Sequence, residues 1–121
     1  MAQVRYIVED VVRAVEFYTS KLGFSLEQQF GSAMAILARD DLRLWLAGPR
    51  ASASQPMPDG SRPVPGGWCR IVIIVDDLEN LAHTLRQQGV GFKGDVVEGP
   101  GGRQVLCSDP SGNLVELFEP A

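Results

Sequence analysis

Residues 70–77, Arg-Ile-Val-Ile-Ile-Val-Asp-Asp, repeat the pattern of residues 3–10, Gln-Val-Arg-Tyr-Ile-Val-Glu-Asp. Each stretch is rich in β-branched and aromatic residues, which favour a strand, and each ends in an aspartate that can cap a helix. Both therefore predict a strand that runs directly into a helix. An internal repeat of this kind decides the fold, because each copy is one supersecondary unit.

The same periodicity continues in both copies. Apolar residues recur at helical spacing from Asp10 to Gly23 and from Asp77 to Gly89, and a glycine there is typical of a helix end. The first apolar stripe comprises Val11, Ala14, Val15, Tyr18 and Leu22, and the second comprises Leu78, Leu81, Ala82 and Leu85. The segments Leu22-Gly23-Phe24 and Val90-Gly91-Phe92 then open a second strand in each copy.

Each copy closes with a predicted hairpin. Residues 32–39 turn into residues 42–47, and residues 103–108 turn into residues 113–119. The second turn, Asp-Pro-Ser-Gly at 109–112, is strongly indicated, because proline sets φ and glycine tolerates positive φ. Each copy therefore has the order βαβββ.

We predict an α+β fold in which two tandem βαβββ modules form a cup-shaped mixed sheet within one domain, residues 1–121. The first module covers about residues 2–48, the second covers about residues 68–120, and a loop at 49–67 joins them. That loop contains five prolines, and a structureless loop of this length is either a linker or a functional segment. The sequence leaves open whether it is a tether or a flap over the cup.

The composition excludes several classes of protein. The chain has 121 residues, 45% of them hydrophobic and 21% charged, which is typical of one globular domain. The formal net charge of −4 argues against nucleic-acid binding, which needs a clustered basic face. No apolar run is long enough to span a bilayer, and the N-terminal MAQVRYIVED lacks the features of a secretory signal. We therefore expect a cytoplasmic protein with no membrane or nucleic-acid partner.

Side chains of a strand alternate between its two faces, so each predicted strand has a helix-facing set and an open-face set. The helix-facing sets are uniformly apolar, whereas the open-face sets mix polar, charged and aromatic residues. The open-face residues are Gln3, Arg5, Ile7, Arg43, Trp45, Ala47, Arg70, Val72, Ile74, Leu114, Glu116 and Phe118. This mixture is typical of a ligand pocket, although a single solvent-exposed strand can show it too. Aligning the final strands of the two copies gives Trp45 the position of Glu116.

The other residues of catalytic type have structural explanations. His83, the only histidine, falls between the apolar positions of the second helix and should face solvent. Cys69 falls on the helix-facing side of the fifth strand, so we expect a buried thiol, and Cys69 and Cys107 lack the spacing of a metal site. The glycine-rich segment 99–102 is predicted to be a turn and not a phosphate loop.

These residues resemble the vicinal oxygen chelate superfamily of glyoxalases, bleomycin-resistance proteins and extradiol dioxygenases. The resemblance extends from Gln3 to Pro120. Its most specific segments are Glu9-Asp10, Ala14-Val15-Glu16-Phe17-Tyr18, Leu22-Gly23-Phe24, Val75-Asp76-Asp77-Leu78 and Asp109-Pro110-Ser111-Gly112-Asn113-Leu114-Val115-Glu116-Leu117. The resemblance implies the tandem fold that the repeat predicts.

In metal-using members of this superfamily, four side chains in the cup hold a divalent ion. The corresponding positions here are Gln3, Trp45, Arg70 and Glu116. Only Gln3 and Glu116 could coordinate, whereas a tight transition-metal site needs at least three protein donors, and a guanidinium repels a dication. We therefore expect no metal and no cofactor. Arg70 either replaces the charge of the ion beside Glu116 or only neutralises a buried carboxylate, and the sequence does not choose between these.

The resemblance is greatest to metal-free, drug-sequestering members of the bleomycin-resistance type. It implies a homodimer that binds an aromatic or antibiotic-like small molecule without altering it, with Trp45, Trp68 and Phe30 stacking on the ligand. The ligand-binding residues are then Gln3, Arg5, Phe30, Arg43, Trp45, Trp68, Arg70, Glu116 and Phe118. The three arginines favour an anionic or carbonyl-rich aromatic such as a quinone over a cationic drug, unless acidic side chains neutralise them.

The alternative is an enzyme of the same superfamily. In an isomerase or lyase, Glu116 would act as the general base and Arg70 would stabilise an oxyanion. A structural or regulatory interaction domain is a third class, which the polar residues on the open faces disfavour. The sequence also leaves open whether the halves of the cup close within one chain or are exchanged between two chains.

Overall fold

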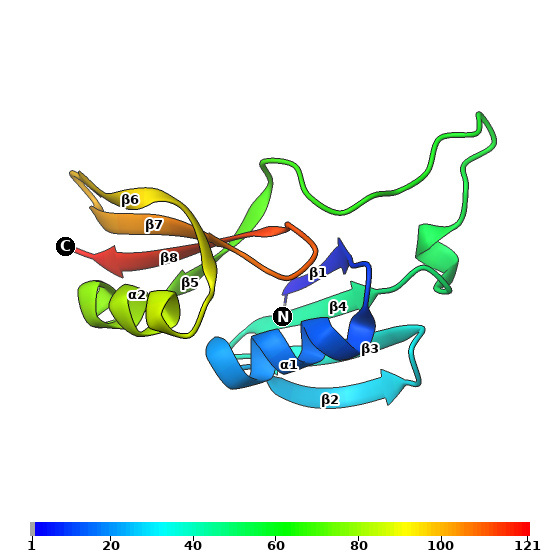
Figure 1. The fold of residues 1–121 in the computed structure, drawn as a ribbon, viewed down its shortest axis with the longest axis horizontal. Coiled ribbons are helices and arrows are strands. Elements are labelled where there is room, and N and C mark those ends of the chain that lie inside the picture. The colour runs from blue at the N-terminus through cyan, green and yellow to red at the C-terminus, as the bar shows by residue number, and fades with distance from the viewer. Residues whose placement is uncertain (1) are drawn as a thin grey trace. The chain divides into compact units, whose positions relative to one another are not determined.

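A computed structural model describes residues 2–121, which divide into two units on either side of the bond between Gly66 and Gly67. The first unit contains β1 (Ala2–Ile7), α1 (Val11–Lys21), β2 (Ser25–Phe30), β3 (Met34–Arg39) and β4 (Leu42–Ala47). The second contains β5 (Arg70–Ile74), α2 (Leu78–Gln87), β6 (Gly91–Gly99), β7 (Gly102–Ser108) and β8 (Leu114–Pro120). Each unit has the order βαβββ (Figure 1), which confirms the predicted α+β fold of tandem modules. The dimer remains a prediction.

The two sheets have the same topology. The strand order is β1-β4-β3-β2 in the first sheet and β5-β8-β7-β6 in the second. In each, the first two strands of that order are parallel and the other neighbours are antiparallel. The register repeats as well, because Trp45 pairs with Arg5 on β1 and Glu116 pairs with Val72 on β5. Trp45 and Glu116 therefore hold equivalent positions, as the sequence repeat predicts.

Helix α1 begins at a side-chain cap and ends at a glycine. Asp10 Oδ1 accepts a hydrogen bond from the backbone N–H of Arg13 at 3.1 Å, which satisfies a donor that the helix itself leaves free. Gly23 follows the helix with a φ of +74°, in the left-handed region where glycine is least strained. Both ends of the helix thus lie where the sequence predicts them.

The buried face of α1 differs from the predicted stripe at one position. Its buried residues are Val11, Ala14, Phe17 and Tyr18. The Tyr18 ring makes edge-to-face contacts with Phe17 and Phe24, at centroid distances of 5.0 and 5.4 Å. Phe17 therefore belongs to the core, whereas Val15, which the periodicity placed there, is only half-buried.

Helix α2 is capped from two sides. Asp77 accepts a hydrogen bond from the backbone N–H of Asn80 at 3.3 Å, and Glu119 on β8 accepts one from the backbone N–H of Leu78 at 2.9 Å. Of the predicted apolar stripe, Leu78, Ala82 and Leu85 are buried and Leu81 is only half-buried, and His83 is exposed, as predicted. Within residues 2–121, neither helix has the length and apolar character needed to cross a membrane.

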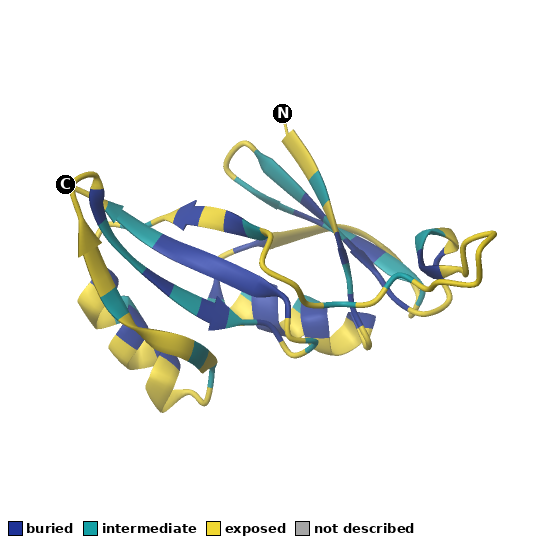
Figure 2. Ribbon diagram, turned by 90° about the horizontal axis from the view of Figure 1, so that it is seen from above, coloured by how far each residue is buried: buried dark blue, intermediate teal, exposed yellow. Residues whose placement is uncertain are grey.

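Burial is concentrated on the helix-covered face of each sheet. The fully buried side chains include Leu37, Leu44 and Leu46 in the first unit and Val105, Val115 and Leu117 in the second. By contrast, every residue of the edge strand β2 is exposed (Figure 2). The face of each sheet away from its helix is therefore the place where polar side chains can act.

The predicted turn at residues 109–112 is held by the Asp109 side chain. Its Oδ1 accepts hydrogen bonds from the backbone N–H groups of Ser111 and Asn113, both at 2.9 Å, and its Oδ2 accepts one from the Asn113 side-chain amide at 3.0 Å. Gly112 has a φ of +87°, as such a turn requires. Asp109 is only 4% exposed, so these bonds fix the turn from inside the unit.

The loop between the modules is partly ordered by contacts with the first unit. A short 3₁₀ turn spans Ser52–Ser54, and Ala51 and Ser54 are buried. The Ser54 hydroxyl donates to the carbonyl oxygen of Ala47 at 3.5 Å. A second turn forms where the backbone N–H of Met57 donates to the carbonyl oxygen of Ser61 at 2.7 Å. The sequence suggested a structureless loop. The structure differs, because residues 51–61 contain two hydrogen-bonded turns.

The two cysteines lie in different environments, and the prediction for Cys69 is wrong. Cys69 is exposed rather than buried, because β5 begins only at Arg70 and residue 69 precedes the strand ladder. Cys107 on β7 is buried. Desolvation, followed by the nearby charge of Asp109, raises the pKa of the Cys107 thiol to about 12.

Candidate functional site

The first candidate surface, called the first open face, is the face of the first sheet that α1 does not cover. Strand register aligns its side chains in rows across β1, β4 and β3. The rows are Gln3, Arg43 and Ala38; then Arg5, Trp45 and Ile36; and then Ile7, Ala47 and Met34. Trp45 occupies the centre of this face, with the predicted residues Gln3, Arg5 and Arg43 around it.

Two residues of β1 fix the Trp45 indole. The indole Nε1–H donates a hydrogen bond to Gln3 Oε1 at 2.8 Å. The Arg5 guanidinium carbon lies 4.9 Å from the centroid of the Trp45 ring, within the range of a cation–π interaction. Gln3 and Arg5 are two residues apart on one strand, so both point to this face. The indole is therefore held at its edge by an amide and over its ring by a cation.

Arg43 is paired with an acid that sequence reasoning missed. Arg43 Nε lies 2.8 Å from Glu27 Oε1, and the two side chains are 40% and 39% exposed. The contact is an ion pair rather than a hydrogen bond, because Arg43 Nε has no partner of hydrogen-bonding geometry within residues 2–121. The register of β2 shifts between Leu26 and Gln28, and this bulge brings Glu27 to Arg43. The residue pattern carries no signal for such a bulge.

The helix-free face of the second sheet, called the second open face, carries the other predicted pair. Arg70 Nε and Nη2 each lie 3.1 Å from Glu116 Oε1, and Glu116 is only 8% exposed. The predicted pairing is present, and it joins the neighbouring strands β5 and β8 of one sheet. The Gln3–Trp45 hydrogen bond has the same geometry in the first module. In both, a residue of the first strand contacts the residue two positions beyond its direct partner on the last strand.

The three remaining aromatic candidates are placed outside these pairs. Trp68 is 67% exposed just before β5, and Lys93 Nζ lies 4.6 Å from its ring centroid. Phe30 is 48% exposed at the end of β2. Phe118 is half-buried on β8, where it pairs with Ile74. The structure thus groups Gln3 and Arg5 around Trp45 in the first unit and Arg70 with Glu116 in the second, and it leaves these three aromatic residues outside both groups.

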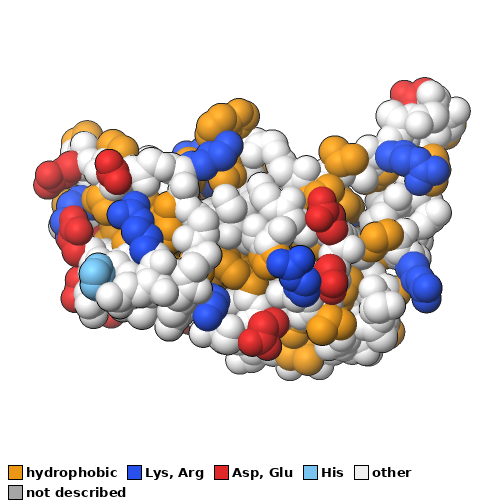
Figure 3. Space-filling view, viewed as in Figure 1, with side chains coloured by type: hydrophobic (Ala, Val, Ile, Leu, Met, Phe, Trp, Pro, Cys, Tyr) orange, Lys and Arg blue, Asp and Glu red, His pale blue; other side chains and the backbone are white. Residues whose placement is uncertain are grey.

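One face of the molecule carries charges of both signs without a broad field of either (Figure 3). On the side shown in Figure 3, acidic and basic side chains are interspersed. The formal net charge of the chain is −4. A preference for one sign of ligand charge would therefore arise from individual residues at the site, because no extended patch steers ligands toward this side.

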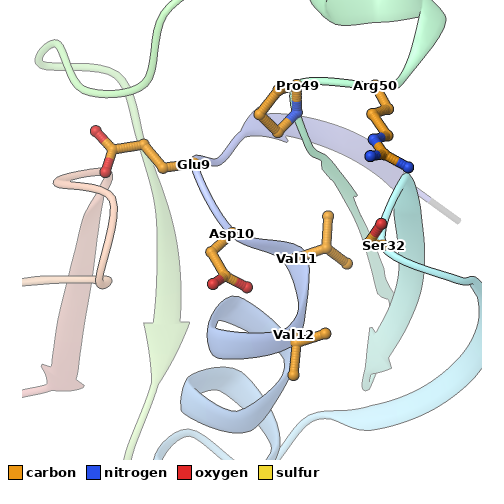
Figure 4. A pocket seen from close by; sticks show the side chains of 7 residues that line it. All are labelled: Glu9, Asp10, Val11, Val12, Ser32, Pro49 and Arg50. Carbon is orange, nitrogen blue, oxygen red and sulfur yellow. The ribbon is translucent and has the colours of Figure 1, made fainter.

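A pocket that sequence reasoning missed lies at the end of the first sheet, beside the start of α1 (Figure 4). Its volume is about 390 Å³, and it is lined by Glu9, Asp10, Val11, Val12, Ser32, Pro49 and Arg50. These residues come from three separate segments, so no local motif marks them. At the adjacent Gly48, a Cβ atom would lie 2.7 Å from Val11 Cγ2, so any larger residue there would force Val11 to move. The charges that line the pocket have both signs, so they do not converge on one class of ligand.

The residues at the four positions of the metal ligands in relatives do not fit a divalent ion. Trp45 presents an N–H donor and Arg70 a cation, neither of which is a metal ligand. Gln3 Oε1 is engaged by Trp45, and Glu116 Oε1 is engaged by Arg70. Within residues 2–121, no three His, Cys, Asp or Glu side chains are grouped as metal ligands. The donor chemistry therefore disagrees with the metal site of the superfamily.

Comparisons with known proteins agree with this fold. Residues 1–117 match the family described as the Glyoxalase/Bleomycin resistance protein/Dioxygenase superfamily. No curated protein matches the chain significantly.

Several solved structures are similar over nearly their whole length. TnmS3, an antibiotic binding protein from Streptomyces sp. CB03234, is 28% identical with a TM-score of 0.73, covering 98% of this chain and 93% of that one. A superfamily member from Sphaerobacter thermophilus DSM 20745 is also 28% identical, with a TM-score of 0.76 and coverages of 98% and 95%. Lactoylglutathione lyase from Agrobacterium tumefaciens, at 18% identity, shares the fold with a TM-score of 0.76 and coverages of 98% and 92%. The chain therefore belongs to the glyoxalase/bleomycin resistance protein/dioxygenase superfamily.

Proposed function

We propose that the protein binds a planar aromatic or antibiotic-like small molecule on its open sheet faces and releases it unchanged. The observation that carries this proposal is the Trp45 indole at the centre of the first open face, held by Gln3 and Arg5. An aromatic ring that is already fixed loses little freedom when a flat ligand packs on it. The similarity to TnmS3, an antibiotic binding protein, favours the same class of function.

In this proposal the second open face has candidate binding residues of its own, Trp68, Phe118 and the Arg70–Glu116 pair. The guanidinium supplies beside Glu116 the positive charge that an ion supplies in metal-using relatives, so binding needs no metal. Metal analysis of protein purified without chelators should find well under one equivalent. One tightly held equivalent of a divalent metal would contradict this part of the proposal. The homodimer implied by the resemblance can be checked on the same sample by native mass spectrometry.

Ligand binding can be followed through Trp45. The chain has two tryptophans, Trp45 and Trp68, so the variant Trp68→Phe reports on Trp45 alone. We expect at least one member of a panel of bleomycin-type, quinone and phenazine compounds to quench its fluorescence saturably and to raise the melting temperature. A ligand present at 100 times its Kd adds about 2.7 kcal/mol of stability, which is readily measured.

The control is the variant Trp45→Phe, which should bind the same compound about fivefold more weakly in the thermal assay, since one stacking contact contributes about 1 kcal/mol. Chromatography of the recovered compound should show that it is unchanged. If no compound in the panel alters the fluorescence or the melting temperature, the proposal loses its basis.

A second candidate is an isomerase or lyase, which the nearly buried Glu116 carboxylate beside Arg70 favours. There Glu116 would move a proton next to a substrate carbonyl, and Arg70 would stabilise the resulting oxyanion. Loss of the general base typically lowers turnover by about 10²–10⁴-fold. A Glu116→Gln variant that retained full turnover of any substrate found would exclude this role.

A further inference from the structure

We propose that the first open face selects flat ligands that carry an anionic group, and that Arg5 is the residue that determines this specificity. This inference rests on the proposed function and names its ligand class, a planar aromatic carboxylate, sulfonate or phenolate. It depends on which charges of the first open face are neutralised within the first unit.

Only one of the arginines predicted for the first open face is balanced by an acid there. Arg43 Nε lies 2.8 Å from Glu27 Oε1, so its charge is compensated. Arg5 contacts the Trp45 ring at 4.9 Å and makes no ion pair within residues 2–66. The other members of the three rows on this face are uncharged. One uncompensated positive charge therefore remains, and it stands over the proposed stacking platform.

The contact with Trp45 leaves the hydrogen-bonding edge of Arg5 available. A cation–π interaction uses the face of the guanidinium or its charge, whereas its five N–H donors lie in the guanidinium plane. A carboxylate in that plane could accept two of these hydrogen bonds, the geometry that arginine recognises best. A flat ligand could thus pack beside the indole while its anionic group pairs with Arg5.

On the second open face, the cation beside an aromatic ring is Lys93, because Arg70 is engaged by Glu116. Arg70 occupies the same position in the repeat as Gln3, and both its Nε and its Nη2 are directed to Glu116. Lys93 on the edge strand β6 lies 4.6 Å from the Trp68 ring centroid and makes no ion pair within residues 67–121. Its ammonium is a point charge, however, and lacks the planar pair of donors with which Arg5 can bind a carboxylate. The formal net charge of −4 repels anions weakly at a distance, but salt screens it beyond about 8 Å. At contact distance the local charge of Arg5 prevails.

The test uses three probes with one ring and different charges: 2-naphthoate, 2-naphthamide and 2-naphthylmethylammonium. In ¹⁵N-labelled protein the two tryptophan indole N–H groups give separate NMR signals, and the variant Trp45→Phe assigns the signal of Trp45. Titration at pH 7 yields a Kd for each probe at Trp45, and the Trp68 signal reports separately on the ring beside Lys93. We expect naphthoate to bind about five- to tenfold more tightly than naphthamide, and the ammonium probe to bind most weakly.

Three variants separate charge from structure. Arg5→Gln should reduce the affinity for naphthoate to that for naphthamide. Arg5→Lys keeps the charge and should retain part of the preference. Glu27→Gln should have the opposite effect. It removes the acid that pairs with Arg43, which leaves a second uncompensated positive charge and should increase the preference for naphthoate.

The outcomes distinguish the two levels of the proposal. Equal binding of naphthoate and naphthamide, or a preference that survives in Arg5→Gln, would overturn the anion selectivity while leaving aromatic binding intact. If none of the probes shifts the Trp45 indole signal, both the selectivity and the proposed platform at Trp45 are wrong.

Discussion

At the scale of single residues, the two cysteines differ in reactivity because they differ in solvation. Cys69 is exposed, whereas Cys107 is fully buried with its pKa raised to about 12 by desolvation. At pH 8 about one Cys107 thiol in 10⁴ is ionised, and only the thiolate reacts. We predict that Ellman's reagent modifies one thiol of the native protein within minutes and the second only after unfolding in guanidinium chloride. The variant Cys69→Ser should remove the fast reaction, and two fast equivalents would contradict the burial of Cys107.

At the scale of elements, the start of α2 depends on the last strand of the chain. Glu119 Oε1 accepts from the backbone N–H of Leu78, and Glu119 Oε2 lies 2.9 Å from Arg103 Nη2. The hydrogen bond from Leu78, and to a smaller extent that from Arg103, lowers the pKa of Glu119 below its ordinary value of 4.5. A lowered pKa means that the stabilising contribution is present above pH 4.5 and is lost as the pH falls below it. The stability that Glu119 on β8 gives to the start of α2 therefore depends on pH.

We predict that Glu119→Gln lowers the urea midpoint of unfolding at pH 6 and that the difference from wild type shrinks at pH 3. The matched control is Glu79→Gln, because Glu79 also pairs with Arg103 but is 64% exposed. An exposed ion pair contributes little, so this variant should differ from wild type by less than about 0.5 kcal/mol. Equal effects of Glu119→Gln at both pH values would show that its contribution is not electrostatic.

At the scale of the whole molecule, the open question is the role of the loop between the modules. It is either a tether that only links them or a flap that affects ligand binding. Gly60, with a φ of +89°, is the exposed tip of the second turn in this loop. We predict that insertion of six Gly and Ser residues after Gly60 changes the free energy of unfolding by less than about 1 kcal/mol, because loop-closure entropy rises slowly with length. Quenching of Trp45 by a ligand should be unchanged if the segment is a tether. A tenfold loss of affinity with unchanged stability would show instead that it is a flap.

Much of the fold could be predicted because the chain is a duplication. A pattern of strands and helices seen in one module could be compared with the same pattern in the other. The helix caps Asp10 and Asp77 and the turn at 109–112 are local features, so the pattern reveals them directly. The errors arose where packing prevailed over periodicity. Phe17 replaced Val15 in the core because a larger ring packs against Tyr18, and Cys69 is exposed because the ladder begins one residue later.

The sequence by itself determined the tandem βαβββ order, the two faces of each strand and the equivalence of Trp45 with Glu116. These properties follow from periodicity, which each segment carries locally. The sequence also predicted Arg70 beside Glu116, and the two side chains do form an ion pair. Only the tertiary structure decided that the charge of Arg43 is compensated, because the bulge in β2 brings Glu27 to it. Ion pairing depends on distances of a few ångströms between separate strands, so residue types alone could not show that Arg5 stands apart from these pairs.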